Sequence, residues 1–395
     1  MNLRLSRLLD VADVPHAYPF ALVQAAVAAS WVLPSAVIPI LALDRLGGAQ
    51  EASVFFFAVS FVGLFGALVV PSMVDKFGRR TVFILGALLI AAAGVVFPIA
   101  GAIGLAAGMA CYIFGFLCLD ITYNVAMMER IPRKAFARFE PVRMMCVGAG
   151  FVIAPWLGVR LSLDVGTWAT FAVMAALTVI SAIFTFRYRL IEESGNQTTA
   201  RRPSNPLRFV PRFARQPRLR LAWLLAFVRS CWWTMFFIYA PIYCVEYGLG
   251  EDMAGIILSV ASVFMLLVPL WGRLGRRIGM RALLAIGYLG TGLLSAAVTP
   301  LADWPVMGVM LLLAAALAGS LIDAVGNALF LRAVHPHERA EMAAVFTTYR
   351  ETAKIGAPGA FAVLLSVFSL PAVFLAGGLF AVAGAWYTRY VPKRY

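Results

Sequence analysis

Charged side chains are scarce in this sequence. Asp, Glu, Lys and Arg make up 13% of its 395 residues, whereas 62% of the residues are hydrophobic. A soluble globular chain carries roughly 25% charged residues. The shortage excludes an ordinary water-soluble protein, so the chain has to be divided into membrane spans before it is divided into domains.

Groups that carry out catalysis or bind metal ions are also few. The sequence contains three histidines and five cysteines, with no CxxC pair, no metal-ligand spacing and no GxxxxGK[ST] phosphate loop. No histidine lies deep in an apolar run beside a serine or cysteine, as a nucleophilic enzyme would require. We therefore expect no enzyme activity, no metal ion, no cofactor and no self-contained ATP-driven pump.

Long apolar runs dominate the sequence instead. A run of about 20 apolar residues crosses the bilayer core as a helix, because an open strand would leave backbone groups unpaired in lipid. The sequence thus predicts an all-α membrane protein with twelve transmembrane helices. They are expected near 18–43, 52–74, 81–99, 104–128, 139–160, 166–187, 219–246, 253–272, 281–299, 305–331, 342–367 and 371–389.

The distribution of basic residues supports this list of spans. Of the 33 Lys and Arg residues, 29 lie in the two terminal segments, in alternate connections between the spans or in the span ends that border these connections. Basic residues collect in cytoplasmic loops. We therefore expect a multi-pass protein of the cell (inner) membrane with both termini in the cytoplasm. Topology thereby accounts for the net charge of +14, and no nucleic-acid partner is expected.

The two halves of the chain repeat short patterns in the same order, at offsets of roughly 200 residues. Any one match is weak, but four in chain order favour a duplicated six-helix unit. The expected domains are an N-terminal bundle over 1–187, a basic cytoplasmic linker over 188–217 and a C-terminal bundle over 218–395. The matches pair Asp75-x2-Gly78 with Arg276-x2-Gly279, Trp31 with Trp233, Asp120-x3-Asn124 with Asp323-x3-Asn327, and Phe139-x3-Arg143 with Phe346-x3-Arg350.

The linker changes character along its length. A polar stretch is followed by PLRFVPRFARQPRLR, in which arginines alternate with apolar residues. This alternation is typical of a helix that lies on an anionic membrane surface. A positively charged segment that only fixes topology is the alternative.

The loop after the second span resembles the G-x3-D-x2-G-R-[RK] signature of the major facilitator superfamily. Asp75, Gly78, Arg79 and Arg80 match the signature, and Pro71 replaces its first glycine. The resemblance extends over the whole chain through the six-plus-six topology and the degenerate second copy. It implies two pseudo-symmetric bundles, alternating access, and cytoplasmic gating contacts by the acid and the arginines. A charged turn that only fixes topology is the alternative.

The fifth span contains Gly150-x3-Ala154-Pro155-x2-Gly158, which resembles part of a pattern found in exporters of this family. Small residues allow two helices to pack closely, and a proline bends a helix. The pattern favours export over import. However, the stretch 104–119 lacks the arginine that drug/proton antiporters carry in the fourth span.

Ionisable side chains inside the spans are the main candidates for a functional site, because charge at bilayer depth is costly. Counting residues from the turns puts Asp120 level with Arg143, and Asp323 level with Arg350. These pairs either border a central cavity and bind substrate or a proton, or form permanent salt bridges. The substrate and proton candidates are Asp120, Asn124, Arg143, Arg229, Asp323, Asn327, Arg350 and Lys354.

Further pairings are open for these candidates. Arg229 lies beside two tryptophans and is expected to contact either an anionic ligand or one of the acids, Asp323 or Asp120. Asn124 and Asn327 are expected one helical turn beyond the acids, on the same face. Glu351 and Lys354 are three residues apart and can pair with each other.

These expectations together predict a secondary active transporter of small organic solutes, working by proton-coupled export. An uptake permease for an anionic metabolite is the alternative, because arginines outnumber acids inside the spans. A receptor or scaffold of the same fold that does not transport is the alternative of a different class. The expected partners are a small-molecule substrate, protons and the lipid bilayer, and the expected state is a monomer.

Overall fold

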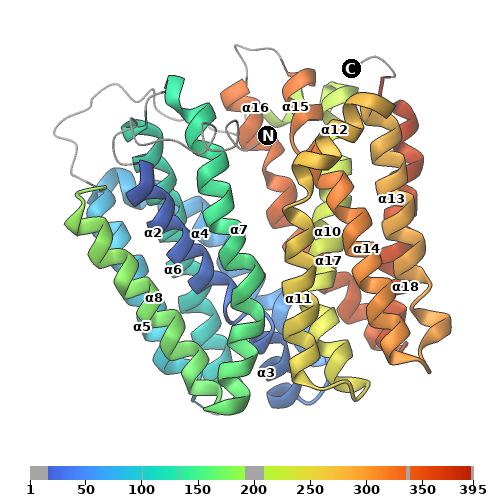
Figure 1. Ribbon diagram of the computed structural model, residues 1–395, viewed down its shortest axis with the longest axis horizontal. Coiled ribbons are helices and arrows are strands. Elements are labelled where there is room, and N and C mark those ends of the chain that lie inside the picture. Colours follow the sequence, from blue (N-terminus) through green and yellow to red (C-terminus); the bar gives the residue numbers. More distant parts are fainter. Residues whose placement is uncertain (1–16, 100, 132, 192–208, 335–338, 393–395) are drawn as a thin grey trace, which may run out of the picture. The chain divides into compact units, whose positions relative to one another are not determined.

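The computed structural model of the chain describes residues 17–99, 101–131, 133–191, 209–334 and 339–392. In these residues the regular structure is helical, which confirms the predicted all-α class (Figure 1). The first-half helices are α2 (Ala17–Val32), α3 (Val37–Leu46), α4 (Ala49–Phe77), α5 (Arg79–Val96), α6 (Gly101–Arg130), α7 (Arg133–Asp164) and α8 (Thr167–Arg187).

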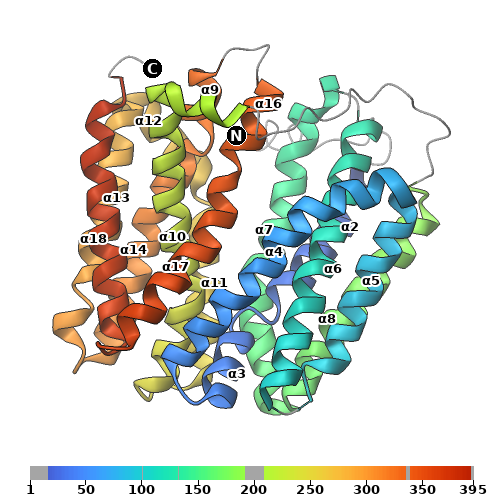
Figure 2. The same ribbon diagram turned by 180° about the vertical axis from the view of Figure 1, so that it is seen from behind.

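The second half contains the remaining helices (Figure 2). They are α9 (Val210–Arg215), α10 (Pro217–Glu246), α11 (Glu251–Met265), α12 (Val268–Ile278), α13 (Met280–Ala296), the 3-10 turn η2 (Thr299–Leu301), α14 (Pro305–Val325), α15 (Ala328–Ala333), α16 (Arg339–Phe346), α17 (Thr348–Leu365), α18 (Pro371–Tyr387) and the 3-10 turn η4 (Thr388–Tyr390).

Ten of the described helical segments are long and apolar enough to cross a membrane, and α11 with α12 makes an eleventh if this bent pair is one span. The remaining predicted span, 342–367, corresponds to α16 and α17. Three charged residues in the first turns of α17 lower its hydropathy: Arg350, Glu351 and Lys354. The structure is therefore consistent with the predicted twelve spans.

Several predicted spans are interrupted. The axis bends by 49° between α11 and α12, just before Pro269 at the start of α12. Proline lacks the backbone N–H and its ring collides with the carbonyl group four residues earlier, so a helix breaks there. Gly326 ends α14 with φ 50° and ψ −127°, a conformation that only glycine adopts without strain.

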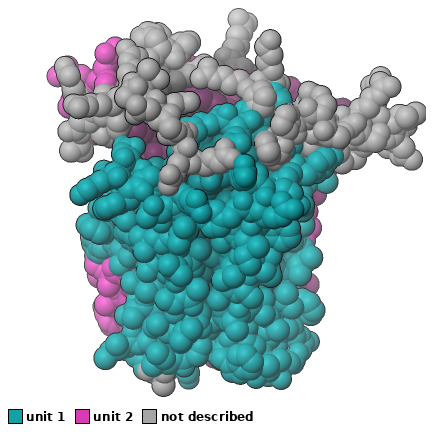
Figure 3. All heavy atoms as spheres, turned by 90° about the vertical axis from the view of Figure 1, so that its left-hand side faces the viewer, with its two compact units in different colours: residues 1–47, 61–195, 254–262 teal, residues 48–60, 196–253, 263–395 magenta. Residues whose placement is uncertain are grey.

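The described chain forms two compact units, coloured separately in Figure 3. The first comprises residues 1–47, 61–195 and 254–262, and the second comprises residues 48–60, 196–253 and 263–395. Each unit thus contains most of one half of the chain and a short segment of a span from the other half. The predicted domain limits stay a prediction, and most of the predicted linker lies outside the described residues.

In the first unit, α5 packs against α6 and α8, and α2 packs against α7 and α8. In the second unit, α13 packs against α14 and α18, and α10 packs against α17 and α18. These are equivalent contacts if the second half repeats the first. The loops before α5 and α13 are also alike, since Gly78 and Gly279 have almost the same backbone conformation (φ 80°, ψ 156° and φ 88°, ψ 149°).

Candidate functional site

Opposite charges meet inside the second unit, where α10, α14 and α17 carry ionisable side chains. Nε of Arg229 on α10 lies 3.6 Å from Oδ1 of Asp323 on α14. The two side chains are only 14% and 17% exposed. Removal of one partner would leave the other as an uncompensated charge in apolar surroundings, so the two groups depend on each other.

Neutral hydrogen-bonding side chains complete this group. Nε1 of Trp233, one turn beyond Arg229 on α10, donates to Oδ2 of Asp323 over 3.0 Å. The Tyr349 hydroxyl on α17 accepts hydrogen bonds from Arg229 (3.2 Å) and Arg350 (3.1 Å). We name these five residues the Arg229–Asp323 cluster. Two guanidinium groups and one carboxylate give it one excess positive charge.

Hydrogen bonds with α13 fix the position of α10, which carries Arg229 and Trp233. The Tyr288 hydroxyl on α13 donates to the backbone carbonyl of Leu225 on α10. Nε1 of Trp232 donates to Oγ of Ser295 over 2.9 Å, which also ties α10 to α13. The position of Arg229 and Trp233 is therefore set by buried contacts of the helix that carries them.

The structure chooses between the partners that the sequence left open. Asp323 pairs with Arg229, and Arg350 instead donates to Tyr349. The prediction that Asn327 lies one turn beyond Asp323 on the same face is wrong, because α14 ends at Val325 and Gly326 turns the chain. The local pair of Lys354 Nζ and Glu351 Oε1 is confirmed at 2.9 Å.

The equivalent residues of the first half are arranged differently. Nδ2 of Asn124 donates to the backbone oxygen (2.8 Å) and to Oδ1 (3.0 Å) of Asp120, so here the expected one-turn spacing holds. Arg143 forms a two-pronged ion pair with Glu140 on its own helix, with Nε 2.8 Å from Oε2. The pairing of Asp120 with Arg143 stays a prediction.

The loop motif after α4 makes contacts within the first unit. Arg79 forms a bidentate ion pair with Glu129 at the end of α6, with Nη2 2.6 Å from Oε1. The guanidinium group of Arg80 lies 5.4 Å from the centre of the Phe186 ring on α8. Asp75 is exposed. Gly78 directly precedes α5 and has φ 80°, a conformation that favours glycine.

The small residues of α7 lie against α2 and the turn that follows it. A methyl group on Gly158 would overlap the backbone oxygen of Leu33, and one on Gly150 would lie 3.3 Å from the Ala29 side chain. Pro155, which lies between these two glycines in the sequence, is buried. The expected close helix packing is therefore present, whereas a role of this motif in export stays a prediction.

Three contributors were not found from the sequence. Tyr349 and Glu129 belong to no motif in the sequence, although Tyr349 directly precedes the candidate Arg350. Glu140 carried a usable signal, since it precedes Arg143 by three residues, a spacing at which helical side chains meet. In the part of the chain that the structure describes, no group of three or more His, Cys, Asp or Glu residues could hold a metal ion.

Comparisons with solved structures identify the fold. A POT family transporter in complex with 5-aminolevulinic acid matches with a TM-score of 0.74 at 14% identity, over 94% of both chains. The peptide transporter POT in complex with sulfate matches with a TM-score of 0.74 at 14% identity, over 95% of this chain and 94% of that one. The nucleoside transporter NupG matches with a TM-score of 0.72 at 14% identity, over 98% of both.

Sequence comparison finds the family of this chain and no close relative. No curated protein matches the chain. The sequence model described as Major Facilitator Superfamily matches residues 20–351 and 246–395, which together cover nearly the whole chain. With the loop motif, the repeated helix contacts and the transporter fold, this match shows that the chain belongs to the major facilitator superfamily.

Proposed function

We propose that this protein is a secondary active transporter that exports small organic solutes in exchange for protons, by alternating access. The observation that carries the proposal is the Arg229–Asp323 ion pair, which lies among three helices and is contacted by Trp233 and Tyr349. Ionisable groups are retained inside membrane spans where they bind substrates or relay protons. The family match supports transport itself.

The ion pair offers a physical route from proton binding to solute binding. While Asp323 is ionised, Arg229 compensates its charge. A proton on Asp323 cancels the attraction and leaves the guanidinium group in need of another anionic or polar partner. The protonation state of one side chain thereby controls which ligands the other can hold.

Export follows if the solute and the proton compete for Asp323. Each then excludes the other from the cluster, so protons that enter down their gradient drive the solute out. The close packing of Gly150 on α2 and of Gly158 on the turn after α2, in a pattern that resembles exporters of this family, supports this direction.

Proton-coupled uptake of an anionic metabolite is the second candidate. It is favoured by the excess positive charge of the cluster, where Arg229 and Arg350 share the Tyr349 hydroxyl opposite the single acid Asp323. Guanidinium groups bind carboxylates and phosphates through paired hydrogen bonds. In this case protonation of Asp323 releases Arg229 for the solute, and proton and solute travel together.

Transport assays in proteoliposomes test both candidates. A screen for solutes that raise the melting temperature of the purified protein supplies the substrate. An acidic lumen then drives solute entry for exchange with protons, whereas an acidic exterior drives it for co-transport. No accumulation under either gradient and no counterflow would contradict transport and leave the receptor alternative.

The role of Asp323 is tested with Asp323→Asn. We expect this variant to keep counterflow of labelled solute and to lose accumulation driven by the pH gradient, because the amide cannot exchange a proton. Asp303→Asn is the matched control, since Asp303 is exposed just before the start of the same helix. Gradient-driven accumulation by Asp323→Asn at the wild-type level would disprove the proton-carrying role.

A further inference from the structure

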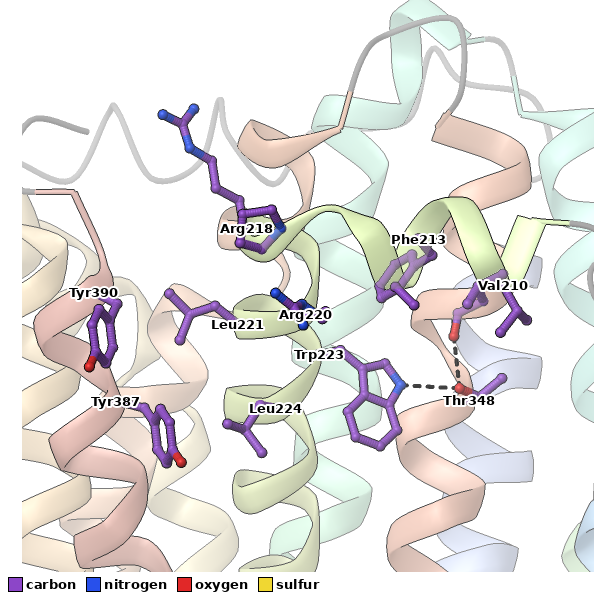
Figure 4. Close-up of a pocket in the computed structure, with 13 residues that line it drawn as sticks. Val210, Phe213, Arg218, Arg220, Leu221, Trp223, Leu224, Thr348, Tyr387 and Tyr390 are labelled. Carbon is purple, nitrogen blue, oxygen red and sulfur yellow. Dashed lines mark hydrogen bonds between the residues drawn. The ribbon is translucent and has the colours of Figure 1, made fainter.

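A pocket of about 960 Å³ opens in the second unit around the first turns of α10. Figure 4 shows Leu221 and Leu224 on the side of α10 that faces Tyr387 and Tyr390, and Trp223 on its other side. The volume lies at the upper end of the roughly 300–1,000 Å³ that is usual for ligand sites. The wall of the pocket is mainly apolar and aromatic, so an occupant needs a substantial hydrophobic part.

Positive charge lies at the rim of this pocket. Arg218 and Arg220 line it and are exposed, and Arg218 extends past the first turn of α10 in Figure 4. Neither arginine has an acidic partner among the described residues, and none of the residues that line the pocket is acidic. The exposed Arg215 of α9 adds charge beside the pocket. The missing component is therefore an anionic group on the occupant.

Aromatic side chains place the pocket at the level of the membrane surface. Tyr387 and Tyr390 end the last described span, and Trp386 beside them stacks on the Arg389 guanidinium group at 3.8 Å. Trp and Tyr are enriched where a span meets the headgroup region. Trp223 is held in place, because its Nε1 donates to Oγ1 of Thr348 over 3.1 Å (Figure 4).

We propose that this pocket binds an anionic phospholipid from the adjacent membrane leaflet. The lipid phosphate contacts Arg218 and Arg220, and the first part of the acyl chains lies along Leu221 and Leu224. Basic pockets between membrane helices bind anionic headgroups in this way. A free phosphate ion would leave the apolar wall exposed, and a neutral lipid would leave the arginines without a partner.

The bound lipid is coupled to the Arg229–Asp323 cluster through two helices. Thr348 contacts Trp223 at the pocket, and its neighbour Tyr349 accepts the hydrogen bond from Arg229. Along α10, Arg220 lies nine residues before Arg229, roughly 13 Å at 1.5 Å per residue. Lipid binding thus holds α10 and α17 together beside the cluster. Regulation of transport rests on the proposed function, whereas lipid binding does not.

Native mass spectrometry of the full-length protein with added phosphatidylglycerol or phosphatidylcholine measures the binding directly. We expect one phosphatidylglycerol to bind more tightly than phosphatidylcholine. In Arg218→Gln/Arg220→Gln this binding should weaken about thirtyfold, since each arginine near an anionic surface contributes roughly a fivefold gain in affinity. Arg276→Gln/Arg277→Gln is the matched control, because it removes the same charge from exposed positions of α12.

A second variant separates the pocket from general surface charge. Leu224→Trp fills the apolar wall without a change in charge, and we expect it to displace the lipid while both arginines remain. Equal weakening by the two double variants would overturn the proposal, as would equal binding of phosphatidylcholine. Protection from unfolding by glycerol phosphate alone, at the level that the lipid gives, would show a soluble phosphate site instead and would also overturn it.

Discussion

Arg229 and Asp323 show how a charge is kept inside a membrane protein at the scale of single residues. Their mutual attraction offsets a desolvation cost that neither side chain could offset alone. Trp233 satisfies the second carboxylate oxygen, and Tyr349 satisfies a second guanidinium nitrogen. The free-energy cost of burying either charge is therefore low only while the other charge is present.

A double-mutant cycle tests this dependence. Asp323→Ala and Arg229→Ala should each lower the melting temperature more than the double variant does, because each leaves one charge uncompensated. We expect a coupling free energy of roughly 0.5–3 kcal/mol. The same cycle on the partly exposed pair Glu351 and Lys354 serves as the control, with about 0.3–0.5 kcal/mol expected. Additive effects at Asp323 and Arg229 would contradict the dependence.

Gly158 sets the distance between α7 and the turn that follows α2. Gly158→Ala places a methyl group on the backbone oxygen of Leu33, which has no flexible side chain to move aside. We expect a loss of roughly 1–3 kcal/mol, as for other overpacked sites, seen as a lower melting temperature. Gly356→Ala is the control, because the nearest atom to its added methyl group is Cζ of Phe227 at 3.9 Å. A harmless Gly158→Ala would show that α7 and the turn after α2 can separate freely.

At the scale of helices, the sequence predicted which segments are helical better than where each helix bends. Residue counting put Asp323 level with Arg350, and that argument needs both helices to run without interruption from the turn. Gly326 ends α14, and the chain breaks again between α16 and α17 at Thr347. These interruptions change both the depth and the facing of the side chains beyond them. Arg229 therefore became the partner, an option that the sequence left open.

The loops that start α5 and α13 allow a test of equivalence between the two halves. Gly78 and Gly279 share a positive φ, and an added methyl group at either would meet no atom within 4 Å. Gly78→Ala and Gly279→Ala should therefore each cost about 1–3 kcal/mol through backbone strain alone. Melting temperatures measure both losses. A large loss at one position and none at the other would show that the two loops do not play equivalent structural roles.

On the scale of the whole molecule, the duplication was readable from the sequence and the exchange of segments was not. Residues 48–60 belong to the compact unit of the second half, and residues 254–262 belong to that of the first. Ser53 Oγ lies 2.7 Å from the Tyr239 hydroxyl, and Ser60 donates to the Lys354 oxygen over 2.8 Å. No pattern along the chain specifies such pairings, because they depend on helices far apart in sequence.

Hydrogen–deuterium exchange should detect motion of the segments 48–60 and 254–262. The alternating access that we propose requires the contacts of 48–60 and 254–262 to break and re-form, and each hydrogen bond contributes only about 1 kcal/mol. We expect amide exchange in both segments to change when a substrate binds. Peptides from α5 and α13, which pack within their own units, serve as the reference. Unchanged exchange in both segments under saturating substrate would contradict this mechanism.

The interruption at Gly326 has an electrostatic consequence that distinguishes the two halves. Asp323 lies two residues before the end of α14, where backbone carbonyl groups lose their helical partners and give the helix terminus a partial negative charge. α6 instead continues ten residues beyond Asp120, to Arg130. The macrodipole of α14 thus adds roughly 0.3–1 kcal/mol of attraction for a cation beside Asp323, and α6 offers no such field at Asp120. The end of α14 therefore favours a cation beside Asp323 more than α6 favours one beside Asp120.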